Sequence, residues 1–226
     1  YVGGQLKGAP ALLAMTVALL ALLFCSRQLL PRGTLQLRPG LPSVIALRGI
    51  AASAFFGGEA FLPLLLQRER DLSPLWAGAA LSLGALGWFS GSWLQGHQHF
   101  GWSRLRMLQT GTWLMLAGLL ISVLTLYPSV PLALALAGWS LTGLGMGLIY
   151  PSLSVLTLSL SAPHEQGSNS SALQLSEGVA VASTLAISGS LFAAMVGGNE
   201  TTGYLLCFVV TLLLAALATQ VSRRIG

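Results

Sequence analysis

Long stretches without a charged side chain dominate the chain. Asp, Glu, Lys and Arg are all absent from five of them, which cover residues 8–26, 72–103, 107–164, 178–199 and 201–222. A helix needs roughly 20 apolar residues to cross a bilayer, so these stretches hold one, one or two, two, one and one helices in that order. The strict alternation of apolar and polar residues that is typical of transmembrane β-strands is absent, which favours helices.

We therefore predict seven transmembrane helices joined by short polar or proline-containing segments. Their approximate ranges are 10–30, 43–66, 74–94, 105–126, 131–153, 168–195 and 202–221. The fifth helix ends near residue 153 or continues past Pro151 as far as residue 160. The segments between them are too short to hold a soluble domain. The predicted fold is an all-α, polytopic bundle that forms one membrane domain.

Composition supports a lipid environment. Hydrophobic residues make up 54% of the chain, charged residues only 8%, and the mean hydropathy is +0.76. An ordinary soluble domain has about 25% charged residues. The net charge of +5 does not indicate a nucleic-acid partner, because the basic residues are confined to loop-like segments, where they set topology.

The basic residues also predict an orientation. If the first helix ends in the cytoplasm, eight basic residues fall on or near that side, and only Lys7, Arg68 and Arg70 fall on the other. Basic residues accumulate in cytoplasmic loops. We expect the N-terminus of this stretch outside and its C-terminus in the cytoplasm of a cell, or inner, membrane.

Charged residues within spans are the strongest candidates for function, because each is costly in the bilayer. Glu59 lies deep in the second predicted helix. Burial disfavours an ionised carboxyl, and a group that exchanges its proton near neutral pH is what a proton-coupled step requires. The alternative is a structural carboxylate paired with a neighbouring helix or a bound water.

Arg48 precedes Glu59 on the same helix face, because eleven steps of 100° return almost to the starting direction. The two residues lie about 16 Å apart along the helix axis, too far for an ion pair. We expect Arg48 to reach toward the interface as a snorkelling cation, with the lining of a cavity as the alternative.

Glu177 belongs to a polar stripe on the sixth predicted helix, which also contains Ser170 and Gln174 at helical spacing. Such a stripe faces the bundle interior or water. We expect Glu177 and Gln174 to line a substrate path, or to form a solvated cap at the cytoplasmic mouth.

Glycines four residues apart allow helices to approach closely, and this spacing occurs at Gly87 and Gly91 and again at Gly143 and Gly147. Packing within one chain is favoured over dimerisation. Pro151 makes the fifth helix the one most prone to bend. Tyr150, beside it, is a candidate cavity aromatic, with interface anchoring as the alternative.

No catalytic or cofactor-binding pattern is present. The histidines lie in loop-like segments without a carboxylate or cysteine at ligand spacing, and no catalytic triad, phosphate loop or dinucleotide fingerprint occurs. We expect no enzyme activity, no metal and no cofactor.

Three segments, residues 30–63, 143–151 and 164–171, carry a resemblance to the major facilitator superfamily, and within it to the drug-efflux-like proton antiporters. Gly91, Arg104 and Arg106 are similar to the family's cytoplasmic loop motif, which controls conformation. Gln95 stands where that motif has an aspartate.

The resemblance implies that residues 43–226 form the six-helix C-terminal half of a transporter, while residues 1–42 supply the last helix before it and a cytoplasmic linker. It further implies proton-coupled export of a small drug-like or lipophilic molecule by alternating access. The partners would be lipid, substrate, protons and a missing N-terminal half, since the chain starts abruptly at Tyr1. A seven-helix receptor or channel is the alternative from another class.

Overall fold

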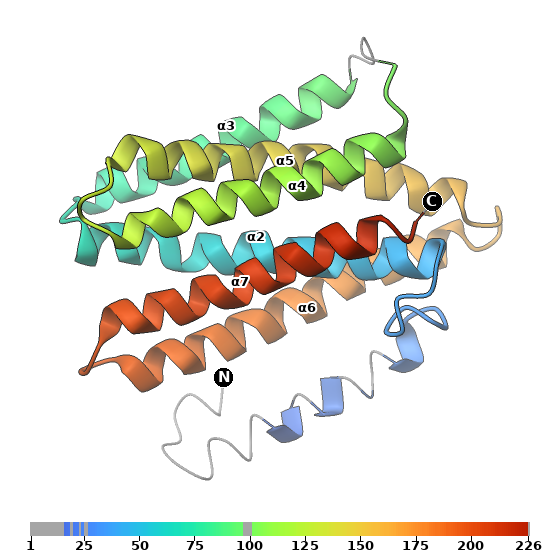
Figure 1. Ribbon diagram of the computed structural model, residues 1–226. Helices are drawn as coiled ribbons and strands as arrows, with labels where there is room; N and C mark the ends of the chain where they lie inside the picture. Colours follow the sequence, from blue (N-terminus) through green and yellow to red (C-terminus); the bar gives the residue numbers. More distant parts are fainter. Residues whose placement is uncertain (1–15, 19, 23, 25–26, 97–100, 226) are drawn as a thin grey trace.

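The computed structural model describes residues 16–18, 20–22, 24, 27–96 and 101–225, and these residues contain helices but no strands. Six long helices carry the fold (Figure 1). They are α2 (Leu41–Glu69), α3 (Pro74–Gly96), α4 (Arg104–Val123), α5 (Leu132–Ser159), α6 (Gln166–Met195) and α7 (Glu200–Ser222). A short 3₁₀ turn, η2 (Leu124–Leu126), follows α4. The all-α bundle predicted from the sequence is confirmed.

Five of these helices, α2, α4, α5, α6 and α7, are long and apolar enough to cross a bilayer. At 1.5 Å per residue they are about 30–45 Å long, which matches or exceeds the hydrocarbon thickness. The helix α3 contains no charged residue but falls short in hydropathy, since it is rich in glycine, serine and tryptophan. About half of the first predicted span lies outside the described residues; its described positions from 16 to 29 are helical. The protein is a multi-pass membrane protein.

Successive helices run in opposite directions (Figure 1). The starts of α2, α4 and α6 and the ends of α3, α5 and α7 therefore meet at one end of the bundle, which we call the basic end. Arginines gather there, namely Arg27, Arg32, Arg38, Arg104, Arg106, Arg223 and Arg224. The helix α5 packs between α3 and α4, α2 packs on α6 and α7, and contacts of α4 with α7 and of α2 with α5 join the two groups.

The contact between α3 and α5 depends on glycine. A Cβ atom on Gly87 would overlap the carbonyl oxygen of Ser140, and one on Gly143 would overlap the carbonyl oxygen of Gly84. Gly91 lies against Gly147, where a Cβ would approach the Gly147 Cα to 3.0 Å. All four glycines of the two sequence pairs thus lie in the contact between α3 and α5 within one chain.

A second glycine face of α5 meets α4. A Cβ on Gly111 would lie 2.7 Å from the carbonyl oxygen of Gly145, and one on Gly138 would lie 2.8 Å from the carbonyl oxygen of Gly118. Bare backbone surfaces therefore flank α5 on both sides. Because lipid supplies no hydrophobic driving force between helices, such close van der Waals contact is a main source of their association.

We expect Gly87→Leu to lower the free energy of unfolding by about 3 kcal/mol, since the new side chain meets backbone that cannot move aside. Denaturation of the purified protein in mixed micelles measures this. The matched control is Gly78→Leu on the same helix, where a Cβ meets nothing within 4 Å. Equal effects of the two substitutions would contradict the packing described here.

Candidate functional site

Three side chains from three helices meet between α2, α5 and α6. The Nε atom of Arg48 donates to Oε2 of Glu177 at 2.6 Å, and the hydroxyl of Tyr150 donates to Oε1 of the same carboxylate at 2.8 Å. The guanidinium of Arg48 also lies over the Tyr150 ring, with Cζ 3.5 Å from the ring centre. We call these three residues the polar triad.

The three residues meet because they lie at similar depth from the basic end. Arg48 is about 11 Å from the start of α2, Tyr150 about 14 Å from the end of α5, and Glu177 about 17 Å from the start of α6. Helices of 28–30 residues exceed a 30 Å hydrocarbon layer by about 6 Å at each end. In a bundle centred in the bilayer, the polar triad thus lies about 5–10 Å below the surface of the apolar layer.

Gly49 lets α2 and α6 come close enough for the ion pair to form. A Cβ atom at this position would lie 2.7 Å from the carbonyl oxygen of Ser176. Ser176 immediately precedes Glu177, and Arg48 immediately precedes Gly49. The backbones of the two helices thus approach closely beside the ion pair.

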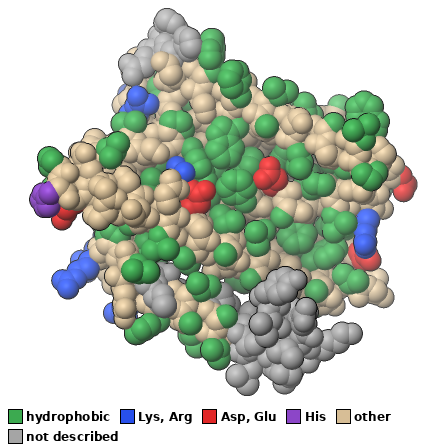
Figure 2. All heavy atoms as spheres, turned by 180° about the vertical axis from the view of Figure 1, so that it is seen from behind, with side chains coloured by type: hydrophobic (Ala, Val, Ile, Leu, Met, Phe, Trp, Pro, Cys, Tyr) green, Lys and Arg blue, Asp and Glu red, His purple; other side chains and the backbone are tan. Residues whose placement is uncertain are grey.

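The ion pair is well enclosed but not sealed. The side chain of Arg48 is 7% exposed and that of Glu177 is 21% exposed. Figure 2 shows acidic and basic side chains next to each other beside a group of hydrophobic side chains. Arg48 is therefore not the snorkelling cation expected from the sequence, since its partner on α6 holds it inside the bundle.

Both carboxylate oxygens of Glu177 receive a hydrogen bond, and one of the two donors is a cation. Removing one member of such a buried pair leaves the other charge uncompensated. Tyr150 links the pair to α5, and its main-chain carbonyl lies 3.5 Å from Nη1 of Arg48. The arrangement can hold a charge in the membrane, and it can exchange partners when one of the three helices moves.

Pro151 follows Tyr150 within α5, which remains helical through it. Proline has no N–H to donate to the carbonyl of residue 147. The hydroxyl of Ser92 on α3 donates to that carbonyl at 3.3 Å instead. A neighbouring helix thus satisfies the backbone group that the proline leaves unpaired, directly beside the polar triad.

An aromatic wall adjoins the polar triad. The ring of Trp88 on α3 lies 4.7 Å from the ring of Tyr150, and Phe55 of α2 lies 5.2 Å from Trp88. The ring centre of Phe56 lies 5.4 Å from that of Phe55 and 6.3 Å from that of Trp88. Trp88, Tyr150 and Phe56 are each only half-buried, so this wall offers apolar ring surface next to an ion pair.

Glu59 lies apart from the polar triad, toward the other end of α2, and is half-buried. Its carboxyl makes no ion pair or hydrogen bond with any described residue. Pro63, four residues on, has no N–H to donate to the Glu59 carbonyl. Glu59 therefore presents an unpartnered carboxyl within a membrane span, and its carbonyl lacks the usual donor four residues on.

Gln174 lies one turn before Glu177 on α6 and is exposed. The helix α6 is also the least buried of the candidate spans, since only 11% of its most apolar stretch is buried. The polar stripe predicted on it therefore continues from the polar triad onto an uncovered surface. An amide on such a surface requires water or protein beside it rather than lipid.

The residues predicted to form a conformational loop lie in the last turns of α3 and the first turn of α4. Gly91 is a packing residue inside α3, Arg104 begins α4, and Arg106 lines a hollow of about 500 Å³ with Trp113 and Arg223. The buried Gln95, at the end of α3, donates through Nε2 to the Leu148 carbonyl at 3.2 Å and to the Ser152 hydroxyl. An ionised aspartate could accept from the Ser152 hydroxyl but could not bond the Leu148 carbonyl, because a carboxylate has no donor.

We expect Arg48→Gln to lower the free energy of unfolding by about 3–5 kcal/mol, since it leaves the Glu177 charge buried and unpaired. The double variant Arg48→Gln/Glu177→Gln should recover most of that loss. Denaturation of the four proteins of this double-mutant cycle in micelles measures the coupling.

The control is the other ion pair, Arg68–Glu200, which has the same 2.6 Å separation but side chains that are 50% and 32% exposed. Water screens such a pair, so its cycle should show a much smaller coupling. Equal coupling in the two cycles would show that the Arg48–Glu177 pair is not desolvated.

No protein-family model matches the chain, and no curated protein matches it significantly. The case for a function therefore rests on the polar triad, the aromatic wall and Glu59.

Proposed function

We propose that this chain is part of a secondary active transporter of the major facilitator type, which exports a small lipophilic molecule in exchange for protons. The observation that supports this most directly is the polar triad of Arg48, Tyr150 and Glu177 inside the membrane layer. Ionisable residues within spans are rare and mark substrate paths, ion paths and proton relays. Three helices contribute to this one, so a relative movement of any of them alters it.

The exposed polar side of α6 supports the proposal that another part of the transporter covers this helix. Gln174 and the partly exposed Glu177 lie on the least buried helix. In transporters built from two halves, the substrate site lies between the halves near the bilayer midplane. An N-terminal half of the same transporter would cover this face and enclose a water-filled path along the polar triad.

The aromatic wall supports a lipophilic substrate. Partly exposed rings of Trp88 and Phe56 offer apolar contact, whereas Arg48 already neutralises Glu177 and covers the Tyr150 ring. Aromatic faces attract organic cations. A drug-like molecule with an apolar body and a positive charge fits both features.

Glu59 supplies the proton-coupling group in this proposal. No described residue pairs with its carboxyl, so no neighbour keeps that carboxyl permanently ionised or permanently protonated. The basic end lies in the cytoplasm, since arginines accumulate on cytoplasmic sides of membrane proteins. Protons then enter from the opposite side, which is nearer to Glu59, and substrate enters near the polar triad.

The test uses the longest polypeptide that contains this chain, reconstituted in proteoliposomes with a fluorescent lipophilic cation. Glu59→Gln should abolish export driven by a pH gradient while leaving membrane insertion intact. Glu177→Gln should slow export by about tenfold or more, since loss of one partner of a buried charge pair costs about 2–5 kcal/mol.

Glu200→Gln is the matched control, because Glu200 forms an exposed pair at the far end of the bundle. It should transport at the normal rate. Unchanged pH-dependent export in Glu59→Gln would overturn the role of that residue. Failure of every protein to move any cation would overturn the proposed function itself.

A further inference from the structure

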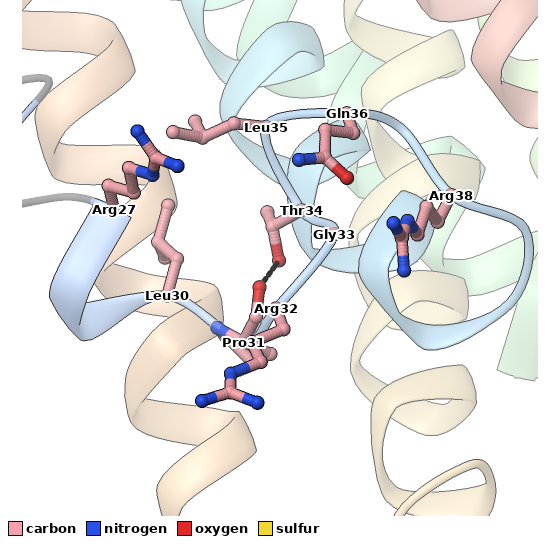
Figure 3. A pocket seen from close by; sticks show the side chains of 9 residues that line it. All are labelled: Arg27, Leu30, Pro31, Arg32, Gly33, Thr34, Leu35, Gln36 and Arg38. Carbon is pink, nitrogen blue, oxygen red and sulfur yellow. Dashed lines mark hydrogen bonds between the residues drawn. The ribbon is translucent and has the colours of Figure 1, made fainter.

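A cavity of about 350 Å³ lies at the basic end, formed by the segment that leads into α2. Three arginines line it, Arg27, Arg32 and Arg38, together with Leu30, Thr34 and Gln36. Figure 3 shows Arg27 and Arg38 on opposite sides, with Thr34 and Gln36 between them and Arg32 at the lower rim. We call this cavity the arginine pocket.

The backbone around the arginine pocket is tightly folded. The N–H groups of Gln36 and Arg38 both donate to the carbonyl of Gly33 at 3.1 Å, and the Thr34 hydroxyl donates to the carbonyl of Pro31 at 2.7 Å. Gly33 has φ +93°, a value that favours glycine. The pocket wall is thus a defined turn and not an open connection.

Gly33 also sets the position of Arg38. A Cβ atom on Gly33 would lie 2.7 Å from Cδ of Arg38 and 3.1 Å from its Cγ. The aliphatic part of Arg38 therefore rests on bare backbone. Its carbonyl is fixed as well, because the N–H and the hydroxyl of Ser43 donate to it at 3.1 Å and 2.7 Å.

The arginine pocket is anchored to the bundle through Leu30. This residue is 9% exposed and packs with Ile45 of α2 and Leu173 of α6. The pocket therefore keeps its position relative to the two helices that carry Arg48 and Glu177.

The charge of the arginine pocket is uncompensated within the described part of the chain. None of Arg27, Arg32 and Arg38 forms an ion pair there, and the lining residues include no carboxylate. All three side chains are exposed, so water screens their mutual repulsion and an anion from outside can reach them. Guanidinium binds phosphate oxygens in a forked geometry.

The position of the arginine pocket indicates where such an anion would come from. The lining residues precede Leu41, the first residue of a 29-residue helix that is about 43 Å long. That length exceeds the hydrocarbon layer, so its start lies at the level of lipid headgroups. Basic clusters at this level attract anionic lipids.

We propose that the arginine pocket is a binding site for a phosphate group, carried by the headgroup of an anionic lipid or by a soluble phosphate ester. Arg27 and Arg38 hold the phosphate from two sides, the Gln36 amide donates to it, and Arg32 adds charge at the rim. The site is separate from the polar triad and does not depend on the proposed transport.

The test is native mass spectrometry of the full 226-residue chain in detergent with added phosphatidylglycerol or, as the neutral reference, phosphatidylcholine. Phosphatidylglycerol should remain bound in preference. In Arg32→Gln/Arg38→Gln its apparent affinity should fall by about tenfold or more, since the variant removes two of the guanidinium groups that contact the phosphate.

Two further variants separate a built site from general charge. Arg104→Gln/Arg224→Gln removes the same charge at the same end from residues that do not line the arginine pocket. Because salt screens charges that do not touch the lipid, this variant should retain the affinity within about twofold. Gly33→Ala retains every arginine but displaces Arg38, so it should bind weakly. Circular dichroism and thermal unfolding confirm that each variant is folded.

Competition identifies the source of the phosphate. Displacement of the lipid by glycerol 1-phosphate would identify the phosphate ester alone as the ligand, and displacement only by a second anionic lipid would identify a lipid site. Equal retention of phosphatidylglycerol and phosphatidylcholine would overturn the proposal. Equal losses in the two double arginine variants would also overturn it.

Discussion

The close approach of α5 to its neighbours is the constraint on which the rest of the bundle depends. Glycines on two faces of α5 bring its backbone into contact with α3 on one side and α4 on the other. In lipid, where apolar surface gains nothing by leaving the solvent, such contact is what selects one arrangement of helices. It fixes the rotation of α5, and that rotation directs Tyr150 toward α2 and α6.

The same principle acts a second time at Gly49, with a different result. Here the absence of a side chain allows α2 to approach α6. The approach brings Arg48 and Glu177 together as an ion pair. A buried ion pair is weak evidence for stability, because desolvation offsets most of its attraction. Its place in this bundle is better explained by what it can bind or exchange than by what it adds to folding.

The sequence predicted the helices well and the polar triad poorly. The limits of α2, α3, α6 and α7 lie within about three residues of their predicted ranges, because charged residues and prolines delimit apolar stretches sharply. The sequence predicts Arg48 at the interface, because Glu59, the carboxyl on the same face of the same helix, is too far away to pair with it. Its partner lies 129 residues away. Two signals could have indicated it: a glycine beside Arg48, and the similar depth of Arg48 and Glu177 from the basic end.

The two intramembrane carboxyls differ in what they can do, and the difference follows from their surroundings. Glu177 has a donor on each oxygen, so any change of its charge or partner disturbs Arg48 and Tyr150 and thus three helices at once. Glu59 has no such donor, so a proton or a cation can bind to it without first displacing a neighbour. A group that responds to an ion must be free to bind it, whereas a group that transmits the response must be connected. Among the described residues, Glu59 meets the first requirement and Glu177 meets the second.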